Sequence, residues 1–168
     1  ILISGRDTSN VEIVNIKENK ISLFPSLNQA REKACSCIIN DKLFVFMGSC
    51  PHSFKPLETI EFFNLKNPDK WEVLEHTLPF NFFGTNCFPL DKDKIIFIGG
   101  KDQADESLDL LLLFDLSNGY GNALKHFDNL ESCLTFINQK SFCIYKYNAD
   151  NLGVIMVDDK SNIFSFNS

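Results

Sequence analysis

The stretch KIIFIGG, residues 94–100, decides the fold, because similar short apolar runs recur along the chain. The other runs are ILISG (residues 1–5), KLFVFMG (residues 42–48) and KSFCIYK (residues 140–146). The last residues of successive runs are 43 to 52 positions apart. A repeat of this length indicates an architecture in which each unit buries its apolar face against its neighbours. We therefore expect a repeat protein.

Each unit carries four strand signals and no convincing helix. The second unit shows this best, with strand-like segments at Lys33–Ile39, Leu43–Met47, Leu57–Asn64 and Trp71–Leu74. Their lengths, their β-branched and aromatic residues, and their Asn, Asp, Gly and Pro boundaries are typical of β-strands. Four short antiparallel strands in a period of 40 to 50 residues are typical of a β-propeller blade.

We therefore predict an all-β fold. The chain would be a β-propeller segment of about four four-stranded antiparallel blades, of which the first is incomplete. The expected blades cover residues 1–31, 32–83, 84–130 and 131–168.

Two further residue types recur in phase with the strands. Asn15, Asn64 and Asp115 each follow an apolar residue at the end of a third strand and are 49 and 51 residues apart. A short side-chain acceptor at this place can bond its own backbone and start the next turn, so we expect three equivalent turns. Cysteines stand seven residues before the lysines that open three of the apolar runs, at positions Cys35, Cys87 and Cys133.

These residues resemble the Kelch repeat, a propeller blade of about fifty residues. An apolar strand ends in Gly99-Gly100, and Phe63-Asn64 and Phe114-Asp115 match the family's aromatic residue followed by a turn residue. Trp71 matches the Trp of the repeat, and Arg31 matches the Arg before the next small-residue strand.

The resemblance covers nearly the whole chain, but the repeats are degenerate. Gly5 and Gly48 are single glycines, the fourth unit has Tyr145-Lys146 in place of glycine, and one unit alone has its Trp. Another all-β repeat and a non-repeat sandwich therefore remain alternatives. Kelch propellers have six or seven blades, so the resemblance implies completion by further blades or by another chain.

Composition argues against some classes of binding partner. The net charge is −6 and no basic stripe is present, which argues against nucleic acid. No apolar run approaches the length of about 18 residues that spans a membrane. The six cysteines are weak evidence for disulfides in a chain of this size, and no Asn-x-Ser/Thr sequon is present, so we expect a cytoplasmic protein with free thiols.

No residue set indicates catalysis. The three histidines, His52, His76 and His126, fall in or beside expected loops and form no recognisable triad. Cys35, Cys87 and Cys133 would face the channel on successive inner strands, where thiolates can bind zinc or copper. Because cysteine also packs as a small apolar residue there, we expect no metal and no cofactor. The prediction is that the protein is not an enzyme.

The loops after the second strand of each unit, residues 6–10, 49–56 and 101–107, are expected to meet on one face. Acidic side chains there favour a basic partner and arginines an acidic one. The predicted partner-binding residues are Arg6, Arg31, His52, Lys101, Asp102, Asp105 and Glu106. The run Leu110–Phe114 is expected to be a strand buried on both faces, with a docking edge as the alternative.

By resemblance, the function is that of a non-enzymatic scaffold for protein–protein interaction. Kelch propellers serve as substrate adaptors of ubiquitin ligases or as cytoskeletal and ciliary scaffolds, which implies association with the cytoskeleton or a cilium. Two alternatives remain. One is a propeller enzyme or metal-binding module with its site at the channel mouth, and the other is a purely architectural wall of a larger complex.

Overall fold

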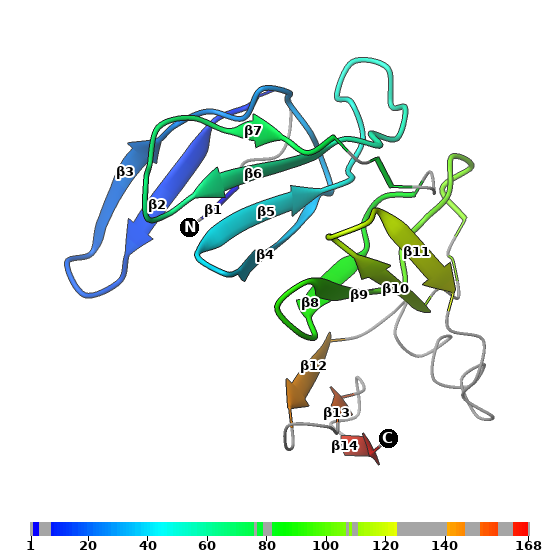
Figure 1. Ribbon diagram of the computed structural model, residues 1–168. Coiled ribbons are helices and arrows are strands. Elements are labelled where there is room, and N and C mark those ends of the chain that lie inside the picture. Colours follow the sequence, from blue (N-terminus) through cyan, green and yellow to red (C-terminus); the bar gives the residue numbers. More distant parts are fainter. Residues whose placement is uncertain are drawn as a thin grey trace.

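The computed structural model consists of antiparallel β-sheets, and no helix occurs among the residues that it describes (Figure 1). The prediction of an all-β protein is therefore confirmed. The described residues are 2–3, 8–75, 77–78, 82–106, 108, 111–123, 141–146, 152–157 and 163–167. In this part of the chain no helix is long and apolar enough to cross a membrane.

The strands form four separate sheets, and in each sheet every strand pairs with the next one along the chain. The first sheet has β1 (Leu2–Ile3), β2 (Val11–Asn15) and β3 (Lys20–Phe24). The second has four strands, which are β4 (Cys35–Ile39), β5 (Lys42–Phe46), β6 (Ile60–Asn64) and β7 (Glu72–Val73).

The third sheet also has four strands, which are β8 (Asn86–Pro89), β9 (Lys94–Ile98), β10 (Leu111–Asp115) and β11 (Tyr120–Ala123). The fourth has β12 (Ser141–Lys146), β13 (Leu152–Val157) and β14 (Ile163–Asn167). Each sheet lies within one of the four residue ranges expected for a blade. Because β10 lies between β9 and β11, the alternative of a docking edge at Leu110–Phe114 is wrong.

The expected turns after the third strands are confirmed. The side-chain oxygens of Asn15, Asn64 and Asp115 each accept a hydrogen bond from the backbone N–H two residues later, at 2.8 to 3.1 Å. These three residues therefore occupy equivalent positions, and they fix the register between repeats. A turn at Asn40-Asp41 connects β4 and β5, and both residues have positive φ, at 48° and 59°. This is the backbone of a two-residue type I′ hairpin, which favours Asn and Asp.

The glycines after the second strands sit where the chain turns sharply against the preceding segment. Gly100 has φ +125° and Gly48 has φ +91°, both in a region that other residues rarely adopt. The residue before each of these glycines also has a left-handed backbone, with φ +66° in Gly99 and φ +54° in Met47. The second sheet thus keeps the backbone of the Gly-Gly pair with a methionine in the first place.

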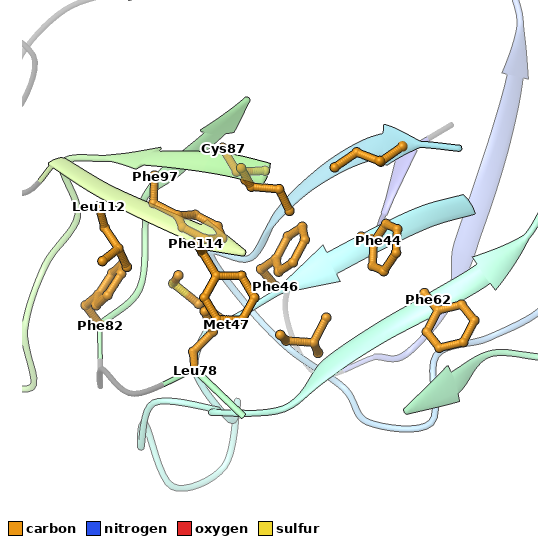
Figure 2. Packing of buried hydrophobic residues seen from close by; sticks show 13 residues of the cluster. Phe44, Phe46, Met47, Phe62, Leu78, Phe82, Cys87, Phe97, Leu112 and Phe114 are labelled. Atoms are coloured by element: carbon orange, nitrogen blue, oxygen red, sulfur yellow. The ribbon is translucent and has the colours of Figure 1, made fainter. Parts of the chain in front are cut away.

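Each face of the second sheet packs against a neighbouring sheet. Along β5, Leu43 and Val45 join a buried cluster with Val11 of the first sheet. The alternate residues Phe44 and Phe46 join a second cluster with the third sheet. Figure 2 shows this second cluster, which contains Phe62, Leu78, Phe82, Cys87, Phe97, Leu112 and Phe114.

The first strands of the second and third sheets, β4 and β8, lie side by side (Figure 1). The rings of Phe46 and Phe97 meet edge to face between these sheets, with centroids 5.2 Å apart. At the hairpin end, the side-chain amide of Asn40 donates a hydrogen bond of 2.7 Å to the carbonyl of Lys92. In the second sheet the apolar residues of both faces are therefore buried by stacking of successive sheets.

We predict that Gly48→Ala lowers the free energy of unfolding by about 3 kcal/mol, from strained φ and steric overlap together. A Cβ at Gly48 would lie 2.6 Å from the carbonyl oxygen of Glu32. Urea unfolding measures the loss. The matched control is Gly84→Ala, at φ +66° with no atom within 4 Å of the added Cβ, which costs only about 1 kcal/mol. Equal losses in the two variants would contradict the close approach at Gly48.

Candidate functional site

The loops after β5 and β9 meet the segments that lead into β4 and β8. Glu32 and Ser49 exchange two backbone hydrogen bonds, of 2.8 and 2.9 Å. Phe83 and Lys101 make the equivalent pair one sheet later, at 2.8 and 3.0 Å. The N–H of Gly84 also donates to the carbonyl of Lys33, at 2.9 Å, and so connects the two leading segments. We call these connected segments, residues 25–34, 47–59, 82–85 and 99–106, the loop face.

Arg31 is not available to a partner on the loop face, which corrects the sequence prediction. It is 1% exposed, and its side chain points into the protein rather than out of the loop. The guanidinium forms an ion pair with the Glu61 carboxylate at 2.6 Å and donates to the carbonyl oxygens of Met47 and Thr59 at 2.9 and 3.1 Å. Burial lowers the pKa of Arg31, and the pairing with Glu61 opposes this effect. Its role is structural.

Glu61 is the residue that sequence reasoning missed. It lies in β6 and is 1% exposed, although a lone glutamate in an alternating strand normally indicates a solvated face. Its second carboxylate oxygen accepts hydrogen bonds from the backbone N–H and the side-chain amide of Asn28, at 2.7 and 3.0 Å. The N–H of Gln29 donates to the first oxygen at 3.2 Å. Glu61 therefore fixes the whole segment between β3 and β4.

The four residues predicted in the loop after β9 do lie together. Lys101 forms an ion pair with Asp105 at 3.0 Å, and Lys33 approaches the same carboxylate at 3.6 Å. Asp102 accepts the backbone N–H of Glu106 at 3.0 Å and so closes the loop. The hydrogen bond from Lys101 lowers the pKa of Asp105. Asp105 thus joins its own loop to the segment before β4.

The loop after β5 presents an aromatic side chain that the prediction overlooked. Phe54 is 72% exposed, and its φ of +56° is unusual for a residue with a large side chain. Backbone hydrogen bonds of 2.8 Å, from Phe54 to the carbonyl of Cys50 and from Cys50 to that of Lys55, hold the loop in this shape. An exposed Phe in a polar loop is visible in the sequence, but the exposure itself depends on this backbone.

Of the remaining predicted residues, His52 is exposed in the same loop, two residues from Phe54. Hydrogen bonds from Ser53 lower the pKa of the neighbouring Cys50 thiol, and the backbone of His52 contributes to the same shift. Arg6, the other predicted partner-binding residue, lies outside the described residues.

Three cysteines gather between the second and third sheets. Cys35 and Cys37 of β4 pack against the cluster that contains Cys87 of β8. Hydrogen bonding to Cys87 and burial raise the pKa of Cys37, and hydrogen bonding to Cys35 with burial raises the pKa of Cys87. Both thiols are therefore protonated at neutral pH. Cys133 lies outside the described residues.

Within the described ranges, no three His, Cys, Asp or Glu side chains converge as ligands for a metal ion. Comparison with protein-family models and with curated proteins finds no match to this chain. The candidate site is the loop face, in which Phe54 and Asp105 lie on the loops after β5 and β9.

We predict that Lys101→Met raises the pKa of Asp105 toward its ordinary value of 3.8, because the variant removes the main hydrogen-bond donor. An NMR titration of the Asp105 carboxyl measures the change. Since the folded-state pKa is depressed, the ion pair stabilises the loop above the ordinary pKa and is lost as the pH falls through the lowered value. Lys33→Met is the control and shifts the pKa less, because its amine is farther from the carboxylate. An unchanged pKa in Lys101→Met would contradict the pairing.

Proposed function

We propose that this protein is a non-enzymatic scaffold for protein–protein interaction and that its sheets are blades of a larger Kelch-like β-propeller. Support comes from the consecutive antiparallel sheets, from the burial of both faces of the second sheet, and from the adjacent first strands β4 and β8. Four-stranded units of this kind stack around an axis in propellers. The equivalent turns at Asn15, Asn64 and Asp115 support a true repeat.

The observation that carries the interaction role is Phe54. Phe54 is a large aromatic side chain that is 72% exposed on a hydrogen-bonded loop. Its burial by a partner would contribute favourably to the free energy of binding. Around it the loop face carries charges of both signs, as expected for the polar rim of a protein interface. Lys33 and Lys101 are already paired with Asp105, so the surface offers no cluster of free cations for a nucleic acid.

The compartment in this proposal is the cytoplasm. The cysteines at positions 35, 37, 50 and 87 are free thiols, as expected of a protein in a reducing environment. Cys37 and Cys87 lie in or against the apolar cluster between the second and third sheets, where they pack as small apolar residues.

We predict that Phe54→Ser weakens binding of the partner by about tenfold or more, because the aromatic anchor of the interface is lost. A photo-reactive phenylalanine analogue at position 54 identifies the partner by cross-linking in cells. Titration calorimetry then compares the purified partner with the wild-type chain and the variant.

The matched control is Ile16→Ser. Ile16 is also apolar and 88% exposed, but it lies in the turn after β2, at the end of its sheet opposite to the loop face. Its variant should bind as the wild type does. A loss of affinity no larger in Phe54→Ser than in Ile16→Ser would contradict a binding role for the loop face.

A further inference from the structure

The face of the first sheet that points away from the second sheet is apolar and open. In the strand register Glu12 lies opposite Leu23 and Val14 opposite Ile21, so these four residues share one face, which we call the outward face. Their neighbours Val11 and Phe24 lie on the other face and pack against the second sheet. On the outward face, Ile21 is 62% exposed and Leu23 is 79% exposed.

The second sheet contains the same face in a covered form. Because Asn15 and Asn64 make equivalent turns, Glu12 corresponds to Glu61 and Val14 to Phe63. Glu12 pairs with Leu23 as Glu61 pairs with Val73, and the same register matches Ile21 with Trp71. The outward face is therefore the positional copy of a face whose occupant is known.

In the second sheet this face is covered by the first sheet together with the segment that carries Arg31. Glu61, Phe63 and Trp71 are 1%, 1% and 3% exposed, whereas Ile21 is 62% exposed. Glu12 and Val14 are half-buried. The exposure of Leu23 does not distinguish the two sheets, because its counterpart Val73 is 52% exposed even in the covered sheet. The discriminating positions are thus Glu12, Val14 and Ile21.

The contacts of Glu61 indicate which chemical groups an occupant of the outward face must supply to Glu12. Glu61 receives the guanidinium of Arg31 and the amide groups of Asn28 and Gln29. The Glu12 carboxylate has no ion pair or hydrogen bond with any described residue. A half-buried carboxylate among apolar side chains is costly unless it is paired. Among the described residues, the copy at Glu12 therefore has no cation that corresponds to Arg31.

The edge of the first sheet lacks a strand in the same way. In the second sheet, β5 pairs with β6 on one side and with β4 on the other. Its equivalent β1 pairs with β2, and among the described strands it has no partner on its other side. In the covered interface, the segment with Arg31 continues directly into β4. One contiguous piece of chain thus supplies both the cation and the strand.

We propose that the outward face of the first sheet binds an extended segment that carries an arginine and continues into a β-strand, a segment of the type of residues 25–40 of this chain. Its guanidinium pairs with the Glu12 carboxylate, its backbone N–H groups donate to the same carboxylate, and its strand adds to the edge of β1. A symmetric second copy does not fit, because it would bring two Glu12 carboxylates together.

This inference rests on the repeat-like stacking in the proposed function, but it concerns a surface separate from the loop face. Failure here would leave the binding at Phe54 untouched. Conversely, Phe54→Ser should have no effect on the outward face.

The experiment uses the full chain and a synthetic peptide of residues 25–40 with both cysteines replaced by serine. Fluorescence anisotropy measures the peptide's affinity. We expect saturable binding that weakens about tenfold or more with Glu12→Gln in the protein or Arg31→Gln in the peptide. The exchanged pair, Glu12→Arg with an Arg31→Glu peptide, should recover part of the affinity.

Two variants complete the design. Ile21→Asp on the outward face should also abolish binding, whereas Ile16→Asp, in the turn, should not. Absence of saturable binding, or equal binding to the wild type and Glu12→Gln, would overturn the proposal. So would a concentration-dependent dimer in sedimentation that Ile21→Asp dissociates, because the occupant would then be a second copy of the chain.

Discussion

The buried pair of Arg31 and Glu61 is the interaction on which the arrangement of the sheets depends. Arg31 Nη2 lies 2.6 Å from Glu61 Oε1, and the two side chains are 0% and 1% exposed. The arginine comes from the connection between the first two sheets, and the glutamate from β6 of the second sheet. A charge buried in this way is tolerated only when it is paired and hydrogen-bonded. The connection is therefore held in one place, and β4 begins where the apolar clusters need it.

Two other features follow from that placement. Because the connection is fixed, Glu32 lies against Ser49, and the chain can turn there only because Gly48 has no Cβ to meet the carbonyl oxygen of Glu32. The same connection brings Lys33 next to Asp105, so that the loops of successive sheets meet on one surface. The loop face and the sheet packing are thus consequences of one buried ion pair. At Glu12 no such ion pair occurs among the described residues, and the outward face is exposed at Ile21.

Much of the fold could be predicted from the sequence, because local chemistry determines it. The strands follow apolar alternation, the turns at Asn15, Asn64 and Asp115 follow from short acceptors, and Asn40-Asp41 marks a hairpin. Arg31 could not be placed, since its burial depends on a glutamate 30 residues later in the chain. Exposure of Phe54 depends on a left-handed backbone that polar loop residues do not specify. Long-range pairing and loop conformation are the parts that residue patterns leave open.

A double-mutant cycle at Arg31 and Glu61, followed by urea unfolding, tests this account most directly. Each single change, Arg31→Gln or Glu61→Gln, should lower the free energy of unfolding by about 3 to 5 kcal/mol, because it leaves a buried group unpaired. The double variant should lose less than the sum of the two single losses, by about 2 kcal/mol or more. Additive losses, or single variants with the midpoint of the wild type, would contradict the central role of the pair.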